Sequence, residues 1–423
     1  MKLAKARVTQ VLAGALLLVA LAVAVVVMRA RVPRTVVMAT GPAGSMYELY
    51  GEQYRQLLAR SGVQVQLRPS GGSIENLGLL SDAGAGIDAG FVSAGSTGTD
   101  KSPQLRTLGT VFLEQLWFFS RDPAVAQGDL TALRGKRMSI GTTGSATRAV
   151  AQVMLRLNQI DPGYADFVAL APQEAAEQLR RGDIQAAFIV TSADSPVVRR
   201  LLADPAINLV GFPRAAAYVA LYPFLMQFTV PEGVGDLASN RPPRDIQTIG
   251  APVSLVVHAN MHPALQALLL RAASQIHSKP GMFNAAGRFP AAEALDIPLS
   301  DGAIQYYKSG TPFLQRYLPF SLAVLAGQLL FIVVPLFGIL YPLLRLGPGL
   351  YSWGMRTRVF RLYGKLKLLE KELDQNPDEA RKLDLRKDLE ALSRRVERMR
   401  TPNTYAPLIY TLRLHINLVR DRL

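Results

Sequence analysis

Four glycine- or serine-rich turns, each between a strand-like run and an amphipathic helical pattern, constrain this chain more than any other feature. They are residues 41–45, 70–73, 141–145 and 191–194. A helix that starts at such a turn has unpaired backbone N–H groups and the positive end of its dipole, so it attracts carboxylates and phosphates. Several such starts facing one crevice would form a site for a small acidic molecule.

Strand-like runs alternate with helical patterns from Thr35 to about Ser309. The runs are residues 36–40, 63–67, 86–92, 134–140 and 186–190. This alternation predicts an α/β fold in which helices cover largely parallel sheets. Ligands of such sheets bind outside the carboxyl ends of the strands, which is where these turns fall.

One longer run differs from the others. Residues 111–120 are aromatic and end without a tight turn, which is typical of a strand that crosses between two lobes. Residues 250–257 would return the chain to the first lobe. The sequence therefore predicts a two-lobed clamp with a cleft, lobe 1 being about 33–118 and 250–317 and lobe 2 about 119–249.

The net charge of +15 is unevenly distributed. Residues 1–34 carry 6 Lys and Arg and no acid, and residues 345–423 carry 18 Lys and Arg against 10 Asp and Glu. Residues 35–344 are balanced, with 23 Lys and Arg against 22 Asp and Glu. A nucleic-acid-binding domain carries an excess of basic residues on its surface. Since the main region has no such excess, we expect no nucleic acid partner.

The basic ends flank two apolar runs. Residues 11–28 follow a basic start and form either an uncleaved signal anchor or a cleavable signal peptide, and the length of the run favours the anchor. Residues 318–344 form the second run, with Pro335 and Pro342 as kink positions and a basic segment after Arg345. A buried core helix is the alternative for this second run.

Two membrane spans would fix the topology. The positive-inside rule places both termini in the cytoplasm of a bacterial inner membrane, if the anchor stays uncleaved, and the main domain in the periplasm. The predicted segments are 1–32 (signal anchor), 33–317 (external domain), 318–344 (transmembrane helix) and 345–423 (cytoplasmic tail).

The tail has helical periodicity. Leucines recur at 3–4 spacing over 362–373 and 385–399, separated by Asn376-Pro377-Asp378-Glu379. Asn376 with Glu379 three residues on predicts a capping box at the second helix, and so a helical hairpin or a short coiled coil. The apolar stripe after Pro407 would lie on the membrane or dock on the preceding helices. The tail is equally compatible with a hairpin packed on itself and with self-association or partner binding.

The sequence contains none of the catalytic or metal-binding motifs that we compared with it. The chain has no cysteine, which excludes disulfides, a thiolate metal site and a catalytic Cys. His258 and His262 are four apart, but Ala259 stands where a metalloprotease needs its acid. The turn at 141–145 lacks the lysine of a P-loop. We expect no enzyme activity, no cofactor and no metal.

Several motifs resemble a known family. Thr40-Gly41-Pro42-Ala43-Gly44 leading to Tyr47, Gly71-Gly72-Ser73-Ile74-Glu75-Asn76-Leu77, and Gly141-x-x-Gly144-Ser145-x-Thr147-Arg148 are similar to motifs of the TAXI-type solute-binding proteins of TRAP transporters. The resemblance covers about 35–310. It implies a type II-like periplasmic binding protein fold that closes on an organic acid or acidic amino acid. Glu48 departs from the family, which usually has an aromatic residue there.

The turns and their neighbours supply the candidate ligand contacts. Their N–H and hydroxyl groups would hold an acidic group, or would only form strand-to-helix turns with N-cap serines. Arg148 would place a guanidinium fork on a carboxylate, or point to solvent. Tyr47 and Trp117 would wall the pocket, or belong to the core. The predicted ligand-binding set is Gly41, Gly44, Ser45, Tyr47, Gly71, Gly72, Ser73, Ser93, Trp117, Thr142, Gly144, Ser145, Thr147, Arg148 and Thr191.

The sequence thus predicts a membrane-tethered solute-binding subunit of a TRAP-type transporter that captures a small anionic solute by clamp closure. Two spans cannot enclose a transport site, so a separate multi-span permease is the expected partner. A transmembrane sensor with an external ligand-binding module and a cytoplasmic partner-binding tail is the rival hypothesis. A purely structural envelope protein is a third.

Overall fold

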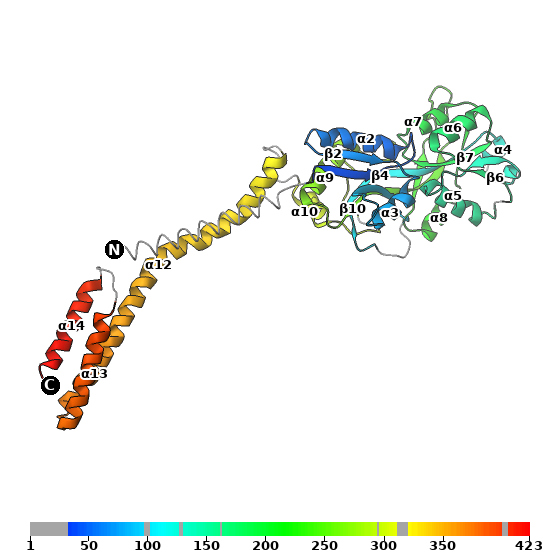
Figure 1. Ribbon diagram of the computed structural model, residues 1–423. Coiled ribbons are helices and arrows are strands. Elements are labelled where there is room, and N and C mark those ends of the chain that lie inside the picture. The colour runs from blue at the N-terminus through cyan, green and yellow to red at the C-terminus, as the bar shows by residue number, and fades with distance from the viewer. Residues whose placement is uncertain are drawn as a thin grey trace. The chain divides into compact units, whose positions relative to one another are not determined.

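The computed structural model describes residues 33–96, 102–126, 130–160, 163–293, 296–310, 320–399 and 405–423. The chain divides into two compact units. One covers Arg31–Val324 and is called the α/β unit below, and the other includes Leu325–Leu423, called the helical tail (Figure 1). The predicted first span, residues 11–28, lies outside the described residues.

The α/β unit begins with the alternation of strands and helices that the sequence predicts. Its first half consists of β1 (Thr35–Ala39), α2 (Met46–Ala59), β2 (Gln64–Arg68), α3 (Ser73–Ser81), β3 (Ala89–Ser93), β4 (Leu105–Ser120), α4 (Pro123–Ala126), a 3₁₀ turn (Leu130–Leu133), β5 (Arg137–Ser139) and α5 (Ala146–Leu157). The strand predicted over 86–92 thus starts three residues later, at Ala89.

The second half continues the pattern and then returns. It consists of β6 (Asp166–Val168), α6 (Pro172–Arg181), β7 (Ala186–Thr191), α7 (Pro196–Ala203), β8 (Asn208–Val210), α8 (Ala215–Leu221), β9 (Met226–Val230), β10 (Ile246–His258), α9 (Pro263–His277) and α10 (Asp301–Ser309). The returning strand predicted over 250–257 is the carboxyl part of β10.

All ten strands belong to one sheet that has two lobes. The strand order is β2-β1-β3-β10-β4-β7-β5-β6, with β8 on β4 and β9 on β10. Neighbouring strands are parallel within β1–β3 and within β5–β7. The long strands β4 and β10 pair with each other in antiparallel orientation and belong to both lobes (Figure 1).

The changeover between lobes falls at one place along β4. Residues from Gln115 onward pair with β7, beginning at the pair Gln115 and Thr191. On β10, the residues from Val253 onward pair with β3 of the first lobe. The ladder between β4 and β10 has register shifts next to Ser254, so the pairing is irregular where the two lobes meet.

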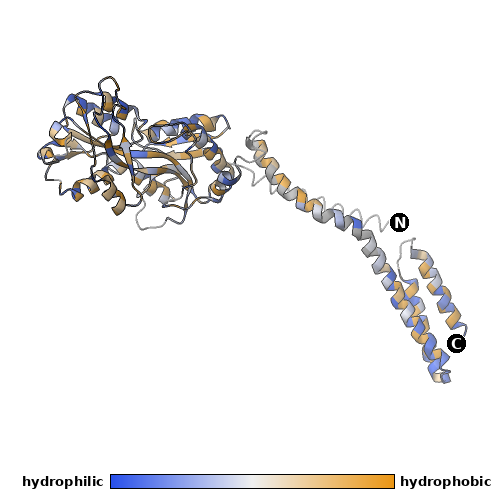
Figure 2. Ribbon diagram, turned by 180° about the vertical axis from the view of Figure 1, so that it is seen from behind, coloured by the Kyte–Doolittle hydropathy of each residue, from blue (hydrophilic) through white to orange (hydrophobic). Residues whose placement is uncertain are grey.

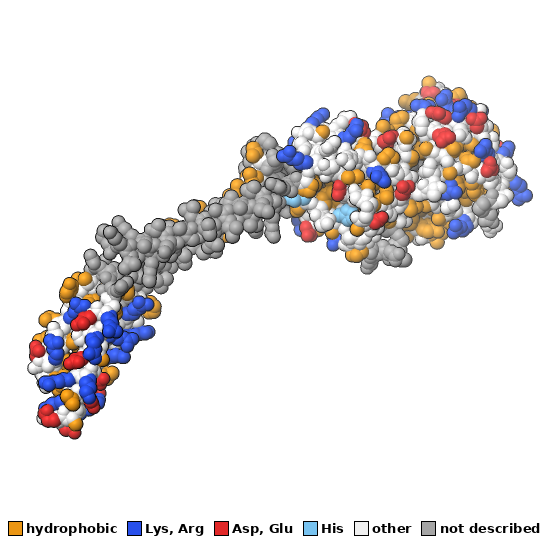
Figure 3. Space-filling view, in the orientation of Figure 1, with side chains coloured by type: hydrophobic (Ala, Val, Ile, Leu, Met, Phe, Trp, Pro, Cys, Tyr) orange, Lys and Arg blue, Asp and Glu red, His pale blue; other side chains and the backbone are white. Residues whose placement is uncertain are grey.

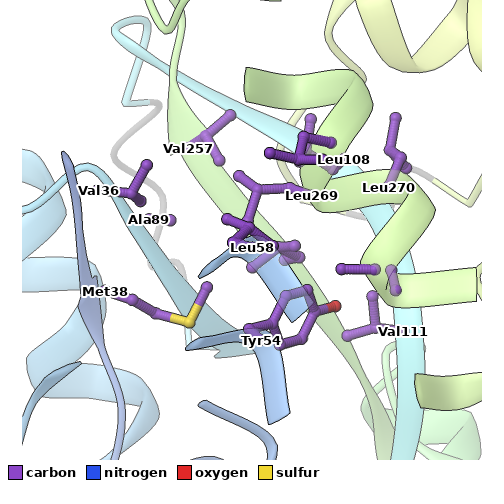
Figure 4. Packing of buried hydrophobic residues seen from close by; sticks show 14 of the residues in the cluster. Val36, Met38, Tyr54, Leu58, Ala89, Leu108, Val111, Val257, Leu269 and Leu270 are labelled. Atoms are coloured by element: carbon purple, nitrogen blue, oxygen red, sulfur yellow. The ribbon is translucent and has the colours of Figure 1, made fainter. Parts of the chain in front are cut away.

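Helices cover both faces of each lobe. In the first lobe, α2, α9 and α10 bury one face of the sheet and α3 the other. Figure 4 shows the first of these clusters, in which Tyr54 and Leu58 of α2 pack with Met38 of β1 and Leu269 of α9. In the second lobe, α5 and α8 cover one face and α6 and α7 the other.

The helical tail consists of three helices: α12 (Phe320–Asp374), of which the tail holds the part from Leu325, α13 (Glu379–Glu397) and α14 (Ala406–Arg420). One apolar cluster joins them, with Leu366 from α12, Leu392 from α13 and Leu412 from α14 among its members. Hydrophobic and hydrophilic residues alternate around α13 and α14 (Figure 2). The stripe predicted after Pro407 therefore docks on the preceding helices.

The break between α12 and α13 is where the sequence predicts it, but the predicted capping box is wrong. Asp378 is the N-cap of α13, and its carboxylate accepts the N–H of Arg381 at 2.9 Å. Asn376 has φ of 56°, in the left-handed region, and ends the preceding segment instead.

The second predicted span, residues 318–344, corresponds from Phe320 onward to the first part of α12. Among the residues that the structure describes, no helix is both long and apolar enough to cross a membrane. The helix that was predicted there is found, and its spanning role is without support from the structure.

Candidate functional site

A small cavity lies between the two lobes of the α/β unit. It encloses about 50 Å³. The first lobe contributes residues from the turns before α2 and α3, and the second lobe contributes the turn before α5 and the end of β7. The walls carry mainly hydroxyl and backbone groups: Ser45, Tyr47, Gly71, Gly72, Ser73, Thr142, Ser145, Thr147 and Thr191 are among the lining residues.

Three helices begin at this cavity. Their first residues, Met46 of α2, Ser73 of α3 and Ala146 of α5, all line it. Among the described hydrogen bonds, none uses the backbone N–H groups of these three residues. Three positive helix ends thus meet at one small volume, and the N–H groups of their first residues have no partner among the described hydrogen bonds. This favours a negatively charged or strongly polar group inside it.

A second, apolar cavity of about 110 Å³ adjoins the first. The two share the wall residues Glu114, Ala146 and Val190. Most of the other residues that line the second cavity are aliphatic or aromatic: Ile74, Leu116, Val150, Val153, Met154, Tyr222, Phe224, Leu225 and Ile249. The site therefore has a polar compartment and an apolar one.

Glu114 is the acidic residue in the shared wall. It is on β4, one residue before the strand changes lobes, and only 4% of it is exposed. The hydroxyl of Tyr47 donates a hydrogen bond to its Oε2 at 3.0 Å. Burial raises the pKa of Glu114 to about 8, and the Tyr47 hydrogen bond opposes only part of that rise. At pH 7 this carboxyl group is therefore mostly protonated.

The chain's own carboxylates occupy some of the donors that the sequence assigns to a ligand. Glu48 accepts the N–H of Gly44 at 2.6 Å, and Glu75 accepts the N–H of Gly71 at 2.8 Å. Each acid is four residues after its glycine, in the first turn of the helix that the glycine precedes. Some of the N–H groups in the turns at 41–45 and 70–73 are thus already hydrogen-bonded within the chain.

The two lobes touch beside the cavity. Thr142 donates its hydroxyl to the carbonyl of Gly71 at 3.3 Å, and the N–H of Glu75 donates to the carbonyl of Gly144 at 3.3 Å. A Cβ on Gly71 would lie 2.3 Å from the carbonyl oxygen of Thr143. Glycine is therefore required at position 71 for the two turns to approach this closely.

The sequence comparison gives the family. The sequence profile described as the NMT1-like family matches residues 38–309, which includes every element from α2 to α10. The chain belongs to the NMT1-like family. The matched region coincides with the α/β unit, and it ends before α12.

Solved structures similar to this NMT1-like chain are distant. A protein from Bordetella bronchiseptica RB50 has 17% identity and a TM-score of 0.37, over 58% of this chain and 73% of its own. An amino acid ABC transporter substrate-binding protein from Streptococcus pneumoniae, bound to L-arginine, has 12% identity and a TM-score of 0.35, over 57% and 88%. The periplasmic aliphatic sulphonate binding protein of Escherichia coli has 14% identity and a TM-score of 0.31, over 70% of this chain and 79% of its own.

Most of the predicted ligand-binding residues come together in this NMT1-like domain. Nine line the polar cavity, namely Ser45, Tyr47, Gly71, Gly72, Ser73, Thr142, Ser145, Thr147 and Thr191, and Ser93 lines the apolar one. Both Ser45 and Ser145 also cap their helices, by accepting the N–H groups of Glu48 and Arg148.

Five predicted residues line neither cavity. Gly41, Gly44 and Gly144 belong to the turns but not to the walls. Trp117 is buried in the second lobe, where its indole N–H donates to the carbonyl of Thr191 at 3.0 Å. Arg148 donates its guanidinium to the carbonyl of Gly141 at 3.3 Å, so that group is directed at the backbone.

The sequence prediction missed Glu114 and the apolar cavity. A signal for Glu114 was present, because it is the lone acid inside the run 111–119, in which Gln115 is the one other polar residue. Acids are almost never fully buried without a partner or a task. No local pattern announces the apolar cavity, since its walls come from six separate elements of both lobes. Within the described ranges, no three His, Asp or Glu side chains are grouped as a metal site requires.

Proposed function

We propose that the α/β unit is a solute-binding module that holds one small polar molecule between its lobes. The observation that carries this proposal is the polar cavity, where three helix starts with free N–H groups meet a buried carboxyl group. Buried donors and acceptors without partners are costly to fold. A bound solute that satisfies them explains why the fold retains them.

The proposed mechanism is clamp closure. Among the described strands, only β4 and β10 run through both lobes, and their ladder is irregular at the changeover. Rotation about that point would open the cavity by separating the turn at 70–73 from the turn at 141–145. A solute that contacts both turns binds the closed form more tightly, and so shifts the equilibrium toward it.

The proposed role is delivery of the solute to a separate multi-span permease of the TRAP type. The motif resemblance to TAXI-type binding proteins supports this role. We further propose that the chain is held at a bacterial inner membrane, with the α/β unit outside and the tail in the cytoplasm. This part rests on the apolar runs 11–28 and 318–344 and their basic flanks. Fractionation with protease protection tests it: digestion of the tail in intact cells would contradict it.

The binding proposal is tested by filling the site. Ala146 lines both cavities, so Ala146→Phe should abolish solute binding, while Ala59→Phe on the exposed end of α2 should not. Thermal unfolding of the full chain is measured with organic acids, amino acids, amines and sugars. A solute at 100 times its Kd adds about 2.7 kcal/mol to stability. Stabilisation that survives in Ala146→Phe, or none from any class, contradicts the proposal.

A sensor is the second candidate function, and the helical tail is the observation that favours it. The tail has a core of its own, yet Tyr410, Leu414 and Leu418 recur at four-residue spacing on α14 and are all exposed. Such a stripe is suited to self-association or to a partner helix. Crosslinking from position 414 separates the roles, since a cytoplasmic regulator supports sensing, whereas a permease supports transport.

A further inference from the structure

The two cavities together restrict the chemistry of the solute. Among the described residues that line them, none is Lys, Arg or His, and Glu114 is the one acid. The predicted small anionic solute, an organic acid or acidic amino acid with Arg148 on its carboxylate, therefore finds no cationic side chain among these wall residues. The helix starts offer partial positive charge at the polar cavity, and Glu114 offers a carboxyl group where the two cavities meet.

One oxygen of Glu114 is available to a ligand. Tyr47 donates to Oε2, and none of the hydrogen bonds among the described residues engages Oε1. The residue is buried, and it lines both cavities. A buried carboxyl group with a free acceptor facing a cavity is suited to a donor that the ligand brings. An ammonium group is the strongest such donor, because it also compensates the cost of ionising the acid there.

The apolar cavity sets the rest of the molecule. Its volume of about 110 Å³ is somewhat below that of the ~150 Å³ apolar cavity that accepts benzene. Val150, Val153 and Met154 of α5 line it, together with Phe224 and Leu225. A charged side group would be desolvated there without a partner. A small branched aliphatic group fits both the size and the polarity.

We propose that the site takes a small amino acid with an apolar side chain. Its ammonium group binds Glu114, its carboxylate faces the starts of α2, α3 and α5, and its side chain fills the apolar cavity. Glu114 is then the residue that selects amines over simple acids. The proposal rests on the proposed function, since it names the solute of the same site.

Proton release is a consequence that can be measured. The titratable groups facing Glu114 are Tyr47 and Tyr50, both on α2. Burial raises the pKa of Tyr50 to about 12 and that of Tyr47 well above its ordinary value, so both stay neutral near pH 7. An ammonium beside Glu114 lowers the pKa of this carboxyl from about 8, so binding at pH 7 should expel about one proton.

The test compares three related molecules by calorimetry on the full chain. L-Valine carries both head groups, 3-methylbutanoate lacks the ammonium, and 2-methylpropylamine lacks the carboxylate. We expect L-valine to bind at least about tenfold more tightly than 3-methylbutanoate, a difference of about 1.4 kcal/mol. In Glu114→Gln this advantage should fall to within about twofold, and the expelled proton should vanish. Glu52→Gln, on the exposed face of α2, is the control and should behave as wild type.

Several outcomes would overturn the proposal. If Glu114→Gln weakens L-valine and 3-methylbutanoate by the same factor, Glu114 has a structural role only. If 3-methylbutanoate or L-aspartate binds wild type as tightly as L-valine, the site does not select an ammonium and an apolar side chain. If some other solute binds in a manner sensitive to Ala146→Phe while L-valine does not bind, the solute class is wrong and the binding function stands.

Discussion

The α/β unit and the helical tail differ in where they place their polar side chains. Every buried polar or charged residue among those described belongs to the α/β unit, including Asn76, Glu114 and Gln266. The tail buries aliphatic side chains from three helices. Its charged side chains of both signs stay on the surface, as Figure 3 shows for one face.

This difference indicates where function is concentrated. Buried polar groups cost stability unless each finds a partner, so a fold keeps them where they have a task. In the α/β unit, six buried polar residues line the cavities, namely Ser73, Ser93, Glu114, Ser145, Thr147 and Thr191. Ser73 accepts the N–H of Ser93 at 2.7 Å, and Asn76 donates to the carbonyls of Thr40 and Phe91. The described part of the tail has the simpler organisation of an amphipathic bundle, whose surface carries its specificity.

The largest expected effect tests whether the two units fold separately. Phe91 is fully buried in the first lobe, with ring centroids of Tyr47 and Tyr54 within 5.9 Å. Phe91→Ala should lower the unfolding free energy of the α/β unit by about 3–5 kcal/mol. Leu412→Ala in the tail is the matched change and should cost about 2–5 kcal/mol there.

Urea unfolding followed by hydrogen exchange checks both variants. Each should destabilise the amides of its own unit and leave the other unit unchanged. A single transition that shifts for the whole chain in either variant would show that the two units unfold together. It would contradict the prediction that they fold separately.

The second prediction concerns the loss of stability as pH rises from about 5 to 8. The pKa of Glu114 is raised from 4.5 to about 8, so its protonated form stabilises the folded state. This contribution is complete below pH 4.5 and is lost as pH rises through 8. The Glu114 contribution to the unfolding free energy of the α/β unit should therefore fall by roughly 1.4 kcal/mol per pH unit between about pH 5 and 8. In Glu114→Gln that slope should disappear, and equal slopes in the two proteins would contradict the prediction.

The third prediction concerns acid and has the opposite sign. His277 is buried against Phe112 at 5.5 Å between ring centroids, its Nε2 has no hydrogen-bond partner among the described residues, and burial lowers its pKa from 6.5 to about 3. Stability that depends on the neutral ring is present above pH 6.5 and is lost as pH falls toward 3. His277→Phe should reduce the acid-induced loss by up to about 1.4 kcal/mol per pH unit below 6.5. Urea titrations at pH 4 to 7 measure the unfolding free energy of both proteins. If its dependence on pH is the same in His277→Phe as in wild type, burial of His277 does not oppose its protonation.

The smallest expected effect is in the tail. Arg422 pairs with Glu370 and Asp374 of α12, and all three side chains are about half exposed. Such surface ion pairs contribute about 0.2–1 kcal/mol and weaken in salt. Arg422→Ala should lower tail stability by no more than that at low salt, and by less at 1 M NaCl. A loss of more than about 2 kcal/mol in the unfolding free energy of the tail would contradict this prediction, because surface ion pairs contribute less than that.

Much of the fold could be predicted from sequence because its signals are local. The positions of β1, β2, β7 and the crossing strands follow from short apolar runs and the turns between them. The three-residue strands β6 and β8 have too few residues for a periodicity to show. The start of α13 was placed two residues early, because Asn376 and Asp378 are both good N-caps and only backbone geometry decides between them.

The site was predicted in part for the same reason. The turns that precede helices are visible in the sequence, and they do line the cavity. The internal acceptors of two of their N–H groups were missed: Glu48 and Glu75, four residues on, accept the N–H groups of Gly44 and Gly71. The role of Arg148 depends on a backbone carbonyl that the fold brings to it. Glu114 gains its importance only from burial, which is a property of the assembled lobes.

The two tryptophans of the chain make these units optically distinguishable. Trp117 is fully buried, and its indole is bonded to Thr191 in the cavity wall, while 69% of Trp353 in α12 is exposed. An indole in an apolar interior emits at shorter wavelength than one in water, so the intrinsic fluorescence spectrum contains one component from each unit. Trp353→Phe would leave a single emitter whose hydrogen-bond acceptor belongs to a residue that lines the site. Because Thr191 lies in the cavity wall, we expect the emission of this variant to change when a solute binds, with no dye attached.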